Sequence, residues 1–481
     1  MPNQRGTVVV LAIFALSCLL PNLGTADESN LINTIRNLEK QMADMQQVIQ
    51  DQNQKIAALE NKEPVVQVVQ QPAPPAQPGF ADPYFENNLK NYMGDSYQWL
   101  KDLKFNGDLR LRYEGWSEHS GSVKNADRNR FRFRLRFGFK KKLSPDMEIG
   151  FRLVSGPRTA TGTETIGQIN STNQTLDNNF DFKDISIDQA YAKYTPAWAE
   201  VGPIKGVTLT GGKFSNPFGE KGGSTWMIWD TDVTPEGAYE KIDLGLISAE
   251  DLNIDMVLLA GQLILEEGAL SDNDDAEMFA YQGGFKTQIS NILPKAIKTK
   301  HFVSFYDYRD FTNNNYQAAG GNFTGGTSLA AGAFKVLDIY NEIAFDIPGM
   351  PHSSKYLEPL SKVTFYHDFL YNLGEDAASK ALGEGQNKGW LIGGKLGEAK
   401  DKGTWEAVYE YAWLEANATA SVFSDAEFGG TNRRGSIFRL KYKMTDNLAL
   451  QTAGFFTNNI LTGTSADIER RVFQVDLVWE L

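Results

Sequence analysis

Cysteine is almost absent from this chain of 481 residues, and the single one, Cys18, lies near the N-terminus. A disulfide framework and a cysteine-based metal site are therefore excluded. Proline is sparse, with 18 residues against 44 glycines, which is typical of a β-rich protein with many turns. Basic residues are outnumbered, 47 against 60 acidic ones, and the formal charge of -13 argues against a nucleic-acid partner.

Catalytic and metal-binding motifs are also missing. The chain contains no HExxH, no GxSxG and no phosphate-cradling glycine loop. The acidic run SDNDDAE, residues 271–277, lacks the glycine and the terminal glutamate of an EF-hand. We therefore expect neither an enzyme, nor a bound metal, nor another cofactor. The four histidines, which share no ligand spacing, are His119, His301, His352 and His367.

Long apolar runs are confined to the N-terminus. Arg5, the run TVVVLAIFALSCLL and the small residues GTA ending at Ala26 follow the order of a secretory signal peptide. A lipoprotein signal at Cys18 is the alternative, although ALSC lacks the usual leucine three residues before the cysteine. No later run approaches about 18 apolar residues, the length of a membrane helix. The exported protein is therefore predicted to be either soluble or a β-barrel, the other structure that spans membranes.

Residues 28–62 carry a heptad pattern. Apolar residues and one glutamine recur in alternating steps of four and three residues over five heptads, which predicts a coiled coil rather than a single amphipathic helix. The polar Gln52 at a d position fits a trimer, but the pattern leaves the number of helices in the coil open. The a positions are Ile35, Met42, Ile49 and Ile56, and the d positions are Leu31, Leu38, Met45, Gln52 and Leu59.

The composition divides the chain into four segments. We expect a signal peptide over 1–26, a coiled-coil stalk over 27–63, a Pro/Gln linker with a short amphipathic helix over 64–100, and a β-domain over 101–481. The β-domain begins where helical periodicity gives way to strand periodicity. Its sixteen strand candidates are centred on 104–114, 129–141, 146–155, 184–195, 206–214, 239–249, 253–262, 276–289, 298–306, 331–345, 358–370, 388–397, 402–414, 433–443, 447–457 and 469–481.

The connections between these strands alternate in length. KLSPD and MTDN are short, whereas 115–127, 156–183 and 215–238 are long. An even number of antiparallel strands, with short turns on one side and long loops on the other, is typical of an outer-membrane barrel. A soluble sandwich or propeller would need no such alternation.

One strand, RNRFRFRLRFGFKKK over residues 128–142, alternates arginine with phenylalanine and leucine. At the strand period of two, all the arginines lie on one face and all the apolar side chains on the other. In TWEAVYEYAW, Trp405 and Trp413 lie eight residues apart on one apolar face. That spacing corresponds to roughly 21 Å of height, close to the ~25 Å apolar band of membrane barrels. The apolar faces are predicted to contact lipid, and the arginines to face the water-filled interior.

This register predicts a basic wall inside the barrel. Arginine walls attract anions, and the alternative is that these arginines neutralise carboxylates inside the barrel such as Asp108 and Glu148. The predicted pore-lining residues are Arg110, Arg112, Arg130, Arg132, Arg134, Arg136 and Arg152, with a second basic group at Arg439, Lys441 and Lys443.

The third long connection, residues 215–238, is acidic and contains two tryptophans. We expect it to fold into the barrel and constrict the pore opposite the basic wall. The alternative is an extracellular loop that makes contacts between subunits. The candidate constriction residues are Glu220, Asp230, Asp232 and Glu236.

Three stretches carry a resemblance to a known family. GDLRLRYE, the arginine strand running into KKKLSPDMEIGFRLVSG, and GGKFSNPFG…WDTDVTPEGAY look like the putative-porin family, a relative of the phosphate-selective porins. The likeness covers about residues 100–481 and is most specific at Gly211–Phe218 and Trp229–Tyr239. It implies a homotrimeric channel whose third loop constricts the pore, and a coiled coil before the barrel is seen among such porins. The chain departs from the pattern by ending in Leu481 rather than in an aromatic residue.

These patterns predict an all-β fold, a 16-stranded antiparallel transmembrane β-barrel in the lipid of the outer membrane, preceded by an α-helical coiled coil in the periplasm. The expected function is that of a porin, a water-filled channel for passive diffusion of small polar solutes that prefers anions. Two other functions stay open. One is an anchor whose coiled coil contacts peptidoglycan and tethers the membrane to the cell wall. The other is the sheath of an electron-transfer conduit, which would need a cytochrome partner because the chain has no CxxCH haem site.

Overall fold

The structure is a computed structural model. It describes residues 102–120, 123–156, 158–161, 164–167, 169–221, 225–267, 275–291, 296–311, 322, 334–347, 361–374, 386–461 and 467–480. The predicted signal peptide, coiled-coil stalk and linker all lie outside these residues. In the part of the chain that is described, no helix has the length and apolar character needed to cross a membrane.

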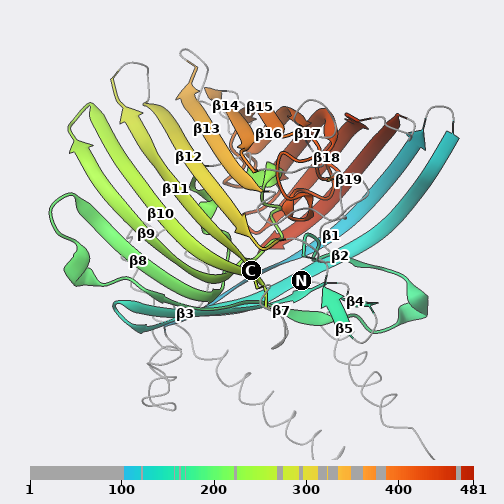
Figure 1. The fold of residues 1–481 in the computed structure, drawn as a ribbon, viewed down its shortest axis with the longest axis horizontal. Coiled ribbons are helices and arrows are strands. Elements are labelled where there is room, and N and C mark those ends of the chain that lie inside the picture. Colours follow the sequence, from blue (N-terminus) through green and yellow to red (C-terminus); the bar gives the residue numbers. More distant parts are fainter. Residues whose placement is uncertain are drawn as a thin grey trace, which may run out of the picture. The chain divides into compact units, whose positions relative to one another are not determined.

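The described strands form one closed antiparallel barrel (Figure 1). The sheet contains seventeen strands, and all of them except the two-residue strand β6 make up the sixteen-stranded ring. Neighbours in sequence pair with each other, and β1 pairs with β19 to close the ring. The barrel strands are β1 Leu103–Ser120, β2 Val123–Ser144, β3 Met147–Ser155, β7 Ile185–Tyr194, β8 Ile204–Lys213, β9 Glu236–Ser248, β10 Leu252–Glu266, β11 Ala276–Ile289, β12 Ile297–Arg309, β13 Lys335–Asp346, β14 Lys362–Asn372, β15 Lys388–Gly397, β16 Trp405–Leu414, β17 Arg433–Lys443, β18 Leu448–Asn459 and β19 Ile468–Glu480.

Shorter elements lie in the connections. β6 pairs with β2 beyond the end of β3, because β2 is 22 residues long and β3 only 9. The chain between β3 and β6 therefore leaves the sheet and returns to the same strand. The short elements are the strands β4 Arg158–Thr161, β5 Glu164–Gly167 and β6 Gln174–Thr175, and the 3-10 helices η1 Asn178–Phe180, η2 Ala197–Ala199, η3 Pro217–Lys221, η4 Thr225–Met227 and η6 Ser421–Phe423.

The predicted strand order and the sixteen-stranded ring are confirmed, whereas one predicted loop is wrong. The expected long connection 115–127 is mostly strand, since β1 continues to Ser120 and β2 begins at Val123. Its polar residues suggested a loop, but the ladder continues there through pairs such as Trp116 with Arg128. The backbone ladder, and not the apolar face, sets the length of these two strands.

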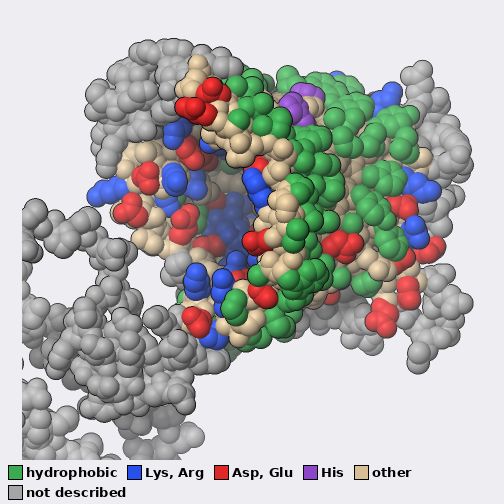
Figure 2. All heavy atoms as spheres, turned by 90° about the vertical axis from the view of Figure 1, so that its left-hand side faces the viewer, with side chains coloured by type: hydrophobic (Ala, Val, Ile, Leu, Met, Phe, Trp, Pro, Cys, Tyr) green, Lys and Arg blue, Asp and Glu red, His purple; other side chains and the backbone are tan. Residues whose placement is uncertain are grey.

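Side chains alternate between the two faces of the wall. On β2, Phe131, Leu135 and Phe137 are 62%, 38% and 46% exposed on the outside, whereas Arg132 and Arg134 are 6% and 7% exposed. Figure 2 shows the hydrophobic side chains as a broad area over the outer surface, and basic side chains deep in a hollow of the molecule. This is the division that a barrel in lipid requires.

Two long connections fold into the barrel. Inner loop 1 comprises residues 214–221 and 225–235, between β8 and β9, and inner loop 2 comprises residues 415–432, between β16 and β17. Phe218 and Trp229 of inner loop 1 contact the ring of Tyr306 on β12, at centroid distances of 5.6 and 5.9 Å. Trp229 also contacts Phe423 of inner loop 2 at 6.0 Å. The inward faces of β10–β14 carry many of the buried apolar side chains, with Asp338 and Asp368 among them, and both loops rest on that half of the wall.

Replacing Trp229 with alanine should loosen inner loop 1. The side chain is 2% exposed, and removal of a buried tryptophan costs about 3–5 kcal/mol. Hydrogen exchange of the amides of residues 225–235 should therefore become faster, while Trp198→Ala on the outer surface, where Trp198 is 75% exposed, should leave it unchanged. Unchanged exchange in Trp229→Ala would show that the aromatic cluster does not hold the loop.

Candidate pore constriction

The inner face of β1 and β2 brings like charges together. Arg110 is the cross-strand partner of Arg134, and Arg112 is the partner of Arg132. Like charges directly opposite each other destabilise a sheet, so this wall requires acceptors from elsewhere. All four side chains are largely buried, with side-chain exposures of 11% or less.

Carboxylates of the barrel strands supply part of the compensation. Asp476 of β19 accepts from Nε and Nη2 of Arg112, both at 2.8 Å. Asp108 of β1 accepts from Nε and Nη2 of Arg134 at 3.0 and 2.8 Å. Two-nitrogen contacts of this kind are among the stronger hydrogen bonds in proteins. Further pairs on the wall are Asp108 with Arg136, Glu114 with Arg130 and Arg132, and Asp188 with Arg152.

The inner loops supply further acceptors for these arginines. Asp232 of inner loop 1 accepts from Nη1 of Arg134 at 3.2 Å, and its second oxygen accepts from the backbone N–H of Thr172 at 3.1 Å. Glu427 of inner loop 2 accepts from Nη1 of Arg112 at 2.9 Å. Both loops thus reach across the lumen and contact the basic wall directly.

The two inner loops are also joined to each other. The backbone N–H of Asp230 donates to the carbonyl of Phe423 at 2.6 Å, and that of Asp425 donates to the carbonyl of Trp226 at 3.1 Å. The ring of Trp226 lies 4.7 Å from that of Phe428. Together the loops form a single constriction between the apolar half of the wall and the arginines.

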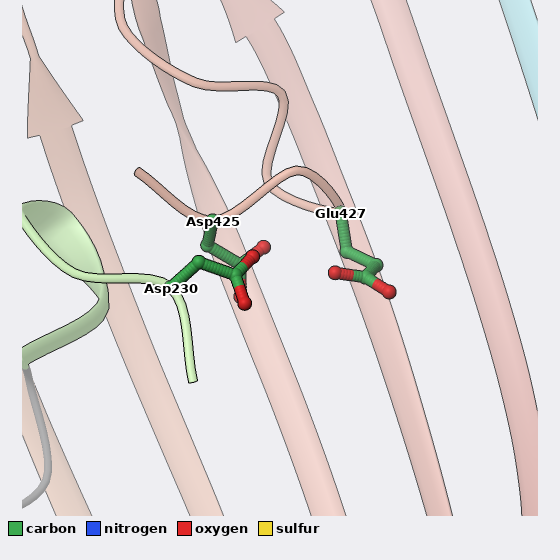
Figure 3. A group of neighbouring side chains, drawn as sticks. All are labelled: Asp230, Asp425 and Glu427. Carbon is green, nitrogen blue, oxygen red and sulfur yellow. The ribbon is translucent and has the colours of Figure 1, made fainter. Parts of the chain in front are cut away.

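Three carboxyl groups meet at this junction (Figure 3). Oxygens of Asp230, Asp425 and Glu427 lie within 4.8 Å of one another. Burial, then repulsion from Asp425 and Glu427, raises the pKa of Asp230 well above its usual range. Burial, then repulsion from Glu427, raises the pKa of Asp425 to about 7. The junction is therefore most stable when Asp230 and Asp425 retain their protons.

Asp232 lies two residues from Asp230 but behaves in the opposite way. Burial alone would raise the pKa of Asp232, but the nearby guanidinium groups of Arg134 and Arg110 outweigh burial and lower it. Asp232 is therefore the charged member of inner loop 1. The same loop presents a neutral carboxyl to inner loop 2 and an anionic one to the wall.

A cavity of about 540 Å³ extends along this constriction. Arg110 and Arg112 line one side, and Asp230 and Asp232 line another. Further lining comes from Glu410, which accepts from Tyr366 Oη at 2.6 Å, Arg439 Nη1 at 2.5 Å and Trp226 Nε1 at 3.1 Å. The cavity thus offers charges of both signs to a solute.

Two of the four predicted constriction residues reach this site. Asp230 and Asp232 lie in inner loop 1, whereas the side chain of Glu220 is outside the described residues. Glu236 is misplaced by the prediction, because it is the first residue of β9 rather than part of the loop. Glu236 forms an ion pair with Lys213 at 2.7 Å. Strand alternation places it on the outer face of the barrel, the face that carries the exposed Leu209.

Inner loop 2 and its carboxylates were not predicted from the sequence. Asp425 and Glu427 lie in a connection with no distinctive motif, so only the folded chain reveals them. Of the second predicted basic group, Arg439 binds Glu410 and Lys443 binds Glu480 at 2.7 Å. Among the histidines, His301 and His367 are exposed, and each contacts Asn341.

A model of the family described as "Putative porin" matches residues 118–335 and 337–479. The chain belongs to this family, and family and fold together make it an outer-membrane porin channel of the transmembrane β-barrel type. No curated protein matches the chain.

Several solved structures are similar to the chain at low sequence identity. OprB of Pseudomonas putida has a TM-score of 0.46 at 10% identity, covering 81% of this chain and 97% of its own. A triple mutant of the Rhodopseudomonas blastica porin has a TM-score of 0.37 at 8% identity, covering 79% and 100%. A loop-deletion mutant of OmpT, an outer membrane protein of Vibrio cholerae, has a TM-score of 0.37 at 13% identity, covering 79% and 99%.

Raising the pH should loosen the contact between the two inner loops. The pKa of Asp425 is raised from an ordinary value of 3.8 to about 7, so its stabilising protonation is complete below about pH 4 and lost as the pH rises through 7. Hydrogen exchange in residues 421–428, corrected for the intrinsic rate, should therefore accelerate between pH 6 and 8. Asp425→Asn should abolish this pH dependence of hydrogen exchange. If exchange in the variant depends on pH as it does in the wild type, a group other than Asp425 is responsible.

Proposed function

We propose that this outer-membrane porin passes small polar solutes by passive diffusion and prefers anions, and that the arginine wall sets the preference. Six arginines of β1 and β2 face three strand carboxylates, Asp108, Glu114 and Asp476, and two loop carboxylates, Asp232 and Glu427. The wall therefore keeps one positive charge in excess. The observation that carries the proposal is a pair of donors, Arg110 Nε and Arg132 Nε, that are buried and have no hydrogen-bond partner.

The magnitude of the electrostatic effect supports a selective pore. Two unit charges about 4 Å apart at an effective dielectric constant near 20 interact by about 4 kcal/mol, far above thermal energy. Screening with a Debye length of about 8 Å at physiological salt confines this effect to the constriction. The overall negative charge of the chain, -13, is spread over the whole sequence and matters less to a solute inside the pore. The preference should weaken as salt rises.

Removing positive charge from the wall should shift selectivity toward cations. The double variant Arg132→Ala/Arg134→Ala removes the arginine that pairs with Asp232 and one of the arginines that pair with Asp108. The reversal potential in a salt gradient across a planar bilayer should therefore move toward cations. Arg434→Ala is the control, because Arg434 is exposed and lies over the ring of Trp413. A cation-selective wild type, or a double variant with an unchanged reversal potential, would show that the inner-loop carboxylates govern selectivity instead.

We further propose that the protein is a homotrimer with a periplasmic stalk. The heptad pattern of residues 28–62 supports self-association. A second support is a group of two apolar side chains in the segment before β7, where Phe180 and Phe182 are 102% and 99% exposed. Such a group fits a contact between copies better than contact with water. The stalk is also the segment that would reach peptidoglycan.

Deleting residues 28–62 should weaken the oligomer without closing the channel. Loss of the coiled coil removes one of two proposed contacts, so the heat-sensitive oligomer band should dissociate at a lower temperature. Conductance per barrel should persist, because the residues that line the constriction belong to the barrel strands and the inner loops. Full loss of conductance would instead tie the stalk to channel function, and an unchanged oligomer would show that the barrel associates without the stalk.

A further inference from the structure

Arg112 and Arg134 bind carboxylates in the same way. Each uses Nε and Nη2 on a carboxylate of a barrel strand, Asp476 for Arg112 and Asp108 for Arg134. Each uses its remaining nitrogen, Nη1, on a carboxylate of an inner loop, at 2.9 Å for Glu427 and 3.2 Å for Asp232. The strand carboxylates belong to the barrel wall and accept two nitrogens of their arginine, whereas each loop carboxylate accepts only one. Asp232 also accepts from the backbone N–H of Thr172, and Glu427 also accepts from Gln474 Nε2 at 3.2 Å.

The arginines beside these two contacts have unused donors. Arg110 donates to Asn173 Oδ1 at 2.6 Å and lies 3.9 Å from Asp476, and its Nε has no partner. Arg132 lies 3.4 Å from Glu114, which it shares with Arg130, and its Nε likewise has no partner. An unpaired buried donor costs about 1–3 kcal/mol. The wall therefore offers more hydrogen-bond donors than the loop carboxylates use.

We propose that Asp232 and Glu427 act as tethered substitutes for an anionic solute, and that a small dicarboxylate displaces them and releases the inner loops from the wall. The inference rests on the anion preference proposed above. Arg112 and Arg134 are diagonal neighbours across β1 and β2, a spacing of about 7–8 Å between Cα atoms. Two carboxylates separated by a few carbon atoms can therefore contact both guanidinium groups.

Exchanging a loop carboxylate for a carboxylate of the solute changes the free energy little. A carboxylate of the solute accepts the same N–H groups that Asp232 and Glu427 accept, and the arginines are already buried before it arrives. The tethered groups have the advantage of effective concentrations in the millimolar range, so solute in that range is needed to compete. Once the loops leave the wall, six arginines face only three strand carboxylates, which increases the attraction for the next anion.

Planar-bilayer conductance with succinate as the probe tests this inference. At low potassium chloride, millimolar succinate should raise the conductance of the wild-type protein in a saturable way. Asp232→Asn/Glu427→Gln should conduct more without succinate and gain nothing from it. Each single variant should respond at a succinate concentration about tenfold lower than the wild-type protein needs, a difference equivalent to about 1.4 kcal/mol. Glu398→Gln is the control, since Glu398 also forms an ion pair. Its partner is Lys362 at 2.7 Å, and both side chains are substantially exposed.

A second measurement on the wild type avoids any folding defect of the variants. Succinate should accelerate hydrogen exchange in residues 225–235 and 421–428, and acetate at the same concentration should do so far less because it cannot span two arginines. Succinate that lowers the wild-type conductance and leaves exchange unchanged would overturn the displacement while preserving anion preference. A wild type with a cation-selective reversal potential and no response to succinate would overturn both.

Discussion

Lipid offers no hydrogen bonds to a polypeptide backbone, and this constraint shapes the whole molecule. A sheet that spans the membrane must close on itself, because an open edge would leave a row of N–H and C=O groups unpaired. Pairing of β1 with β19 meets that requirement. Closure fixes which face of each strand meets lipid, and the alternation of arginine with phenylalanine on β2 follows from it.

Closure also concentrates charge in a small volume. The arginines on β1 and β2 face one another across the ladder, and the barrel neutralises them with groups from three sources. Asp108 and Glu114 come from β1 itself, Asp476 comes from the adjoining last strand, and the inner loops extend across the lumen with Asp232 and Glu427. The opposite half of the wall is richer in apolar side chains and holds those loops through aromatic contacts such as those of Tyr306. The constriction is therefore anchored by packing on one side and by ion pairs on the other.

Local patterns were sufficient to predict the strands and their faces. Period-two alternation located all sixteen strands of the ring, but it ended β1 too early and began β2 too late near residues 115–127, where the sequence is mostly polar. The sequence also offered Asp232 as a constriction residue, because its connection contains two tryptophans that favour burial and carboxylates that can pair with the arginine wall, but an extracellular loop stayed open as the alternative. The partners of the arginines did not follow, because Asp476 and Glu427 lie 364 and 315 residues from Arg112. Glu236 was misassigned because a loop boundary is less sharply encoded than a strand centre.

The pairing of Arg112 with Asp476 joins the first strand of the barrel to the last. The two residues are directly opposite each other in the β1–β19 ladder. A slip of one residue at this seam would place Val475 or Leu477 beside Arg112 and turn Asp476 toward lipid, because each shift by one exchanges the faces of a strand. Neutralising the guanidinium and joining the ends of the sheet are thus one event during assembly. The charge pair therefore favours the correct alignment of the final strand, in addition to the alternation of its apolar and polar faces.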